Sequence, residues 1–212
     1  MTDISVELDG ERAIAWSPEW PGWCRIRTSE EEAVQAVLDT EGRYRLIAQR
    51  AGLSFAPGDL VVVERLQGDA NTPSGVPSVL ASADTRPIDA TTAQRHVALL
   101  RAAWDMLEEV VAASPAKLRK GPRGAGRDRD AIWRHVIEAE RAYARKIGVR
   151  HKPFEMNDTS ALKAMRDEIA AVLSKPSAGE PLVAGGWYAS YAVSRMAWHV
   201  VDHLWEIEDR RS

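Results

Sequence analysis

The spacing of hydrophobic residues changes once along this chain, and that change constrains the fold more than any other feature. Up to about Leu80, apolar side chains alternate or form short runs between turns, which is typical of β-strands. From about Asp89 onward they recur every three or four residues, which places them on one face of an α-helix. The sequence therefore predicts an α+β protein, with a small α/β domain over residues 1–80 and a helical bundle over residues 88–212.

The first part of the chain carries the patterns of short strands. The predicted strands are Ile4–Leu8, Ala13–Trp16, Trp23–Ile26 and Leu60–Val63. The Asp9-Gly10 pair between the first two strands predicts a tight hairpin turn. The unbroken apolar run of the last strand predicts that it is buried.

One long helix is predicted between these strands. Thr28 and Glu31 have the spacing of a capping box, with Thr28 as the N-cap, and Gly52 is expected to end the helix. The stretch from Gln67 to Pro87 is rich in Gly, Pro, Ser, Asp and Thr, so we expect it to be a linker.

The second part of the chain contains four amphipathic segments. They extend approximately over residues 89–113, 129–147, 159–174 and 186–210. Four amphipathic helices of such length favour an up-down four-helix bundle.

The composition argues against several classes of protein. A net charge of −3 gives no global basic character for binding nucleic acid. The basic residues of segment 117–129 lack interleaved aromatics and are offset by Asp128 and Asp130, so we expect a solvated, mobile loop there. The basic residues are Lys117, Arg119, Lys120, Arg123, Arg127 and Arg129. No apolar run reaches the roughly 18 residues that cross a membrane. With one cysteine, Cys24, and no signal peptide, we expect a cytoplasmic protein.

The last predicted helix contains two histidines with HxxxH spacing, His199 and His203. Residues four apart lie one turn above each other, so both imidazoles can reach one ion. At about 100° per residue and with Ala192 at zero, they fall near 340° and 20°, in the middle of the apolar face. We therefore expect both to point into the bundle.

A third histidine, His135, lies beside the apolar face of the second bundle helix. Buried imidazoles are costly unless their nitrogens find partners, and a metal ion partners several at once. Three histidines and an open position would form a site of the catalytic type. The alternative is that all three are hydrogen-bonded core residues. We expect His96 and His151 to be ordinary polar residues.

Two stretches, IWRHVIEAE at 132–140 and WHVVDHLWEIEDR at 198–210, resemble the DinB-like superfamily. The likeness extends over about residues 89–212. Proteins of this superfamily are four-helix bundles with one histidine from the second helix and an HxxxH or similar motif near the C-terminus. The resemblance implies one divalent transition metal, most often zinc or nickel, on His135, His199 and His203. Several members are S-transferases or isomerases that use the low-molecular-weight thiols mycothiol, bacillithiol or glutathione.

Three charged residues flank His199 on the helical wheel, namely Arg195, Asp202 and Glu206. They are candidate catalytic residues, either for orienting the metal ligands or for proton transfer. The alternative is a charged strip at the mouth of the bundle, with Arg195 paired to Asp202 or Glu206.

The N-terminal residues 1–66 resemble the small α/β fold of HicB-type antitoxins. Pro21-Gly22, Thr28 and Glu31–Ala33 carry this likeness, because they lie behind a hairpin and ahead of a helix. Such antitoxins often carry a DNA-binding module, and nothing in this sequence resembles one. The likeness implies a fold and no function.

These observations support three functional hypotheses. The first is a metal-dependent thiol S-transferase, or a related enzyme, acting on a small molecule. The second is a non-catalytic module that binds a ligand or a protein, with a structural metal or no metal. The third is a metal-free bundle with three histidines in its core. The sequence is compatible with a homodimer and gives no reason to expect nucleic acid or membrane partners.

Overall fold

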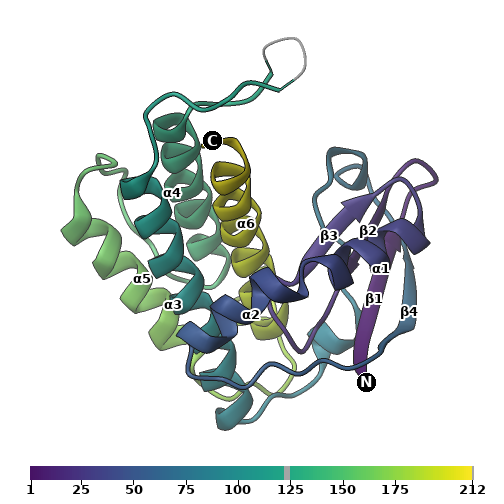
Figure 1. Cartoon of the computed structure of the whole chain (residues 1–212). Helices are drawn as coiled ribbons and strands as arrows, with labels where there is room; N and C mark the ends of the chain where they lie inside the picture. The colour runs from purple at the N-terminus through teal and green to yellow at the C-terminus, as the bar shows by residue number, and fades with distance from the viewer. Residues whose placement is uncertain (122–124, 212) are drawn as a thin grey trace.

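The computed structural model describes residues 1–121 and 125–211, and it consists of a small sheet with two short helices followed by four long helices. The α+β prediction is confirmed. In Figure 1 the sheet and the four-helix bundle lie beside each other, with helix α6 on the side of the bundle that faces the sheet. Arg123 of the basic segment lies outside the described residues.

The sheet has four strands in the order β3-β2-β1-β4. They are β1 (Thr2–Leu8), β2 (Ala13–Trp16), β3 (Cys24–Arg27) and β4 (Leu60–Gln67). The β1–β2 hairpin is confirmed, and β3 pairs antiparallel with β2. Strand β4 lies parallel to β1 at the sheet edge. The prediction that it is buried is wrong, because Val61 is 40% and Val63 is 55% exposed.

The predicted long helix is two helices, α1 (Glu30–Asp39) and α2 (Glu41–Arg50). In a continuous helix the carbonyl of Val37 would accept from the amide of residue 41. It accepts instead from the Trp23 indole N–H at 2.9 Å and from the Thr40 hydroxyl at 2.8 Å. A tertiary contact therefore takes the place of the next helical hydrogen bond and ends α1.

The predicted N-cap of α1 is also shifted by one residue. Ser29, not Thr28, caps the helix, because its hydroxyl accepts from the backbone N–H of Glu32. Thr28 instead donates from its hydroxyl to the Glu32 carboxylate at 2.6 Å. The sequence offered two adjacent hydroxyl residues, and the second one supplies the cap.

The predicted linker is folded against the sheet. The carboxylate of Glu7, fully buried on β1, accepts from the Thr72 hydroxyl at 2.5 Å and from the backbone N–H groups of Ser78 and Val79, both at 3.1 Å. Two short 3-10 helices, Thr72–Ser74 and Ser82–Thr85, lie in this segment. One buried carboxylate on β1 thus holds a chain segment that the composition predicted to be a linker.

The four bundle helices are close to their predicted bounds. They are α3 (Ala90–Ala113), α4 (Arg129–Lys146), α5 (Thr159–Leu173) and α6 (Ala189–Arg210). Asp89 and Asp158 cap α3 and α5 through hydrogen bonds from backbone N–H groups. Helix α3 packs against α5 and α6, and α4 packs against the same two helices.

The direction of the helices differs from simple alternation. Helices α4 and α5 run in the same direction, opposite to α3 and α6 (Figure 1). The Trp133 indole near the start of α4 donates to the backbone carbonyl of Met156, just before α5, at 3.4 Å. The backbone N–H of Trp187, just before α6, donates to the backbone carbonyl of Lys146 at the end of α4. The up-down order therefore fails at α5, because segment 147–158 returns along the length of α4.

The sheet region and the bundle share one hydrophobic core. Buried residues of both halves, such as Trp23 and Leu204, belong to the same packed cluster. At Gly22 the chain approaches α6 so closely that an added Cβ would lie 3.1 Å from the Ala197 backbone, and its φ of 90° also favours glycine. Within the described residues, every helix is too short or too polar to span a bilayer.

We expect Glu7→Ala to lower the free energy of unfolding by about 3 kcal/mol, because it leaves three donors of the 72–79 segment without their acceptor. Urea denaturation followed by circular dichroism measures this change. Glu11→Ala, in the exposed hairpin turn, is the matched control and should change stability by less than about 0.5 kcal/mol. Equal stability of the two variants would contradict the proposed anchoring.

Candidate metal centre

Three histidines from two helices meet inside the bundle. His199 and His203 on α6 are 5% and 8% exposed, and His135 on α4 is partly buried beside them. One ring nitrogen from each lies within 4.8 Å of the other two, and Nε2 of His135 is 3.1 Å from Nε2 of His199. The inward orientation of the HxxxH pair and the approach of the third imidazole are as the sequence predicted.

These separations fit the ligand set of one metal ion. Two nitrogens bound at about 2.0–2.1 Å in a tetrahedral site lie about 3.3 Å apart. The 3.1 Å between His135 and His199 is close to this value. The three residues can therefore hold one ion, with at least one coordination position left to another ligand.

The environment favours the neutral form of His135 and His199, which is the form that binds a metal. Burial, and then the neighbouring His203 and His135 rings, lower the pKa of His199 to about 2. Burial, and then His203, also lower the pKa of His135 below its ordinary value. Protons therefore compete little with a metal ion for His199 near neutral pH.

Glu206 fixes the ring of His203. Nδ1 of His203 donates to the Glu206 carboxylate at 2.8 Å, which leaves Nε2 free as a metal ligand. The Arg210 guanidinium donates to the other oxygen of the same carboxylate. Burial raises the pKa of Glu206, but the bonds from His203 and Arg210 outweigh it, so the net pKa is lowered and the group is ionised. A carboxylate that accepts from a metal-binding histidine orients the ring and raises its basicity.

The other two candidate catalytic residues do not touch the histidines through hydrogen bonds. Asp202 lies 3.7 Å from Arg25 of β3. The Arg195 guanidinium lies over the rings of Trp198 and Tyr143, at 4.5 Å and 5.4 Å from their centroids. Arg195 forms no ion pair with Asp202 or Glu206, so the alternative prediction of such a pair is wrong. Their catalytic roles stay predictions.

Sequence reasoning missed two neighbours of the centre, Tyr143 and Arg210. The Tyr143 ring stands edge-on to His199 with 5.7 Å between centroids. Arg210 is four residues after Glu206, a spacing that predicts an ion pair on a helix and was visible in the sequence. Arg210 also donates to the backbone carbonyls of Arg119 and Arg127, so the basic loop is held against the end of α6.

The remaining histidines lie apart from the centre. His96 on α3 is 5% exposed, and burial lowers its pKa to about 4. His151 faces the Glu168 carboxylate at 3.2 Å. Among the described residues, the only cluster of potential ligands is the one formed by His135, His199 and His203.

We expect Glu206→Gln to weaken the apparent affinity for Zn²⁺ by about 10- to 100-fold, because the His203 ring loses its anionic partner. Competition with a chromophoric chelator measures the affinity. Glu155→Gln, at an exposed position before α5, is the matched control and should bind Zn²⁺ as the parent protein does. Equal affinities for all three proteins would show that Glu206 does not support the site.

The arrangement of the three histidines and Glu206 supports a metal centre at this place. The three imidazoles converge, one is held by an ionised carboxylate, and two are kept neutral by burial. Comparison of the chain with protein-family models, with curated proteins and with solved structures found no match.

Proposed function

We propose that this protein is a metal-dependent enzyme of the DinB-like type, a thiol S-transferase or a close relative. His135, His199 and His203 hold one divalent transition metal, zinc or nickel, in this proposal. The observation that carries it is the convergence of three ring nitrogens within 4.8 Å from two separate helices. Three neutral nitrogen ligands suit these metals.

A metal bound by three protein ligands supplies an open position that can bind a thiol sulfur and stabilise its thiolate. The thiolate is the reactive nucleophile of a low-molecular-weight thiol. This sulfur would attack an electrophilic carbon of a small-molecule substrate, so that a carbon–sulfur bond forms while the bond from that carbon to a leaving group breaks, and the leaving group departs with the electron pair and takes a proton from solvent. The three histidines do not supply the nucleophile themselves. The nucleophile is therefore the sulfur of the thiol cosubstrate.

The charges around the centre support an anionic reactant. Arg195 and Arg127 act on His199 through their positive charge, in the direction that lowers its pKa. Nearby cations favour a thiolate over a thiol for the same reason. Glu206 is an acceptor already engaged by His203 and Arg210, so its role is to position His203.

We expect protein purified without an affinity tag to contain about one divalent transition metal per chain by elemental analysis. The double variant His199→Ala/His203→Ala should contain none, because a single imidazole cannot hold the ion. His151→Ala removes a histidine outside the cluster and should retain the metal. A metal-free parent protein whose stability is unchanged by a chelator would refute the metal centre.

The open coordination position can be tested separately. We expect 2-mercaptoethanol to change the visible spectrum of the cobalt-substituted protein and to add a sulfur-to-cobalt charge-transfer band. Ethylene glycol at the same concentration is the control, because it lacks the thiol. An unchanged spectrum with thiol would contradict the transferase proposal and favour a closed, structural metal in a binding module.

A further inference from the structure

A partly buried cation, Arg195, lies beside the metal centre without an anionic partner. Its guanidinium is 4.5 Å from the centroid of the Trp198 ring and 5.4 Å from the centroid of the Tyr143 ring. The same two rings are neighbours of the His199 ring, with 5.8 Å and 5.7 Å between centroids. Arg195 and His199 therefore share two aromatic neighbours, one on α6 and one on α4.

The Arg195 guanidinium has a hydrogen-bond donor to offer. Its Nη1 is buried and has no partner among the described residues. An arginine nitrogen only donates, and a buried donor without an acceptor is costly. Asp202 lies 3.7 Å from Arg25 instead. Glu206 accepts from His203. Neither of these carboxylates of α6 satisfies Arg195, so its missing acceptor points to a bound reactant.

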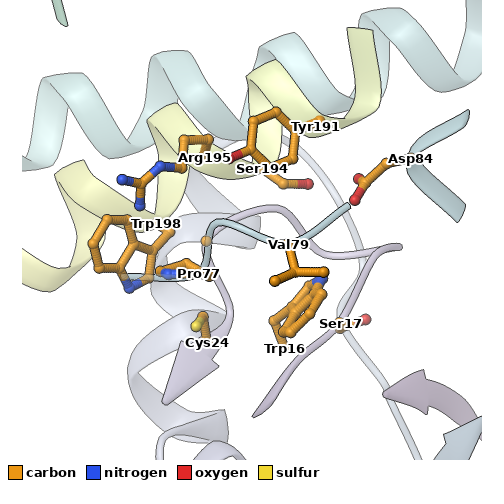
Figure 2. Close-up of a pocket in the computed structure, with 11 residues that line it drawn as sticks. Trp16, Ser17, Cys24, Pro77, Val79, Asp84, Tyr191, Ser194, Arg195 and Trp198 are labelled. Carbon is orange, nitrogen blue, oxygen red and sulfur yellow. The ribbon is translucent and has the colours of Figure 1, made fainter. Parts of the chain in front are cut away.

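The sheet side of Arg195 leaves no room for such a reactant. Figure 2 shows this side, with Trp198 next to Arg195 and Asp84 at the far end. The cavity between them has a volume of about 20 Å³, which holds one water molecule. The Asp84 carboxylate accepts from the backbone N–H of Ala81. An anion therefore has to approach Arg195 from elsewhere, and the Tyr143 ring marks the side on which the metal centre lies.

A second arginine without an ion pair lies at the other end of the histidine cluster. The backbone carbonyl of Arg127 accepts from Arg210, which also donates to Glu206. The Arg127 side chain is exposed and forms no ion pair within the part of the chain that the structure describes. The positive charges of Arg195 and Arg127 both act on His199. Positive charge thus acts on the centre from two sides.

We propose that the thiol cosubstrate of the metal centre carries a carboxylate, which accepts hydrogen bonds from the Arg195 guanidinium while the thiol sulfur takes the open coordination position. Arginine and a carboxylate form short, charge-assisted hydrogen bonds. Arg195 precedes His199 by one helical turn, about 6 Å along the axis. A sulfur and a carboxylate separated by two carbons can span such a distance. This assignment rests on the proposed function and specifies the charge of its cosubstrate.

The test compares 3-mercaptopropionate with its uncharged isostere, 3-mercaptopropionamide. Titration of the cobalt-substituted full chain with each thiol, followed by the sulfur-to-cobalt charge-transfer band, gives two affinities. We expect the parent protein to prefer the carboxylate. Arg195→Met should lower the ratio of the two affinities by about tenfold or more, because a charge-assisted hydrogen bond is lost. Arg127→Gln should lower it by about twofold, because salt screens an exposed charge.

Arg12→Gln, in the exposed turn between β1 and β2, is the matched control and should keep the ratio of the parent protein. Circular dichroism and the cobalt content check that each variant is folded and loaded. Arg195→Gln keeps a polar side chain of similar length, and it replaces Arg195→Met if that variant does not fold.

The outcomes separate this inference from the function on which it rests. An unchanged ratio in a folded, cobalt-loaded Arg195 variant would overturn the carboxylate assignment, and so would a parent protein that binds both thiols equally. In either case thiol binding at the metal would stand. A parent protein whose spectrum responds to neither thiol would overturn the proposed transferase function and the carboxylate assignment together.

Discussion

The structure depends on helix α6 being buried on two faces at once. One face packs against α3 and α4 and carries His199 and His203, while the other lies against the sheet region and carries Trp198. At Gly22 the chain of the sheet region closely approaches the backbone of α6. Because α3 and α4 cover the first face, the surroundings of His199 and His203, which are 5% and 8% exposed, are largely removed from bulk water. Removal from water strengthens every electrostatic interaction within them.

The sequence predicted most of the bundle because local periodicity decides it. Each of the four helices carries an apolar stripe at helical spacing that packs into the bundle, and the caps Asp89 and Asp158 are local signals too. The same reasoning predicted that His199 and His203 point inward, because two residues four apart in an apolar stripe face the core. The approach of His135 was expected only because one more histidine lay on the edge of another stripe. These features needed no knowledge of distant contacts.

Apart from the N-cap of α1, the main features that the sequence did not predict are decided by distant contacts. Helix α1 ends where the Trp23 indole takes the carbonyl of Val37, and the 67–87 segment folds because Glu7 lies buried beneath it. Neither partner is close in sequence to the segment that it shapes. A small cavity beside α6 is lined by residues from β2, β3, the loop between them, the 67–87 segment and α6, so no local pattern could reveal it. The pairing of Asp202 with Arg25 has the same cause.

The positions of buried polar atoms that lack hydrogen-bond partners are informative about function. Of the eight such side-chain atoms among the described residues, three belong to Arg195, Trp198 and His199, which lie within five consecutive positions of α6. Native proteins satisfy nearly all buried polar groups, and the exceptions concentrate where a ligand or a reaction uses them. Arg195 precedes His199 by one helical turn, and its positive charge acts in the direction that lowers the pKa of His199. One turn of α6 therefore carries a guanidinium and an imidazole that each have a buried nitrogen without a partner among the described residues.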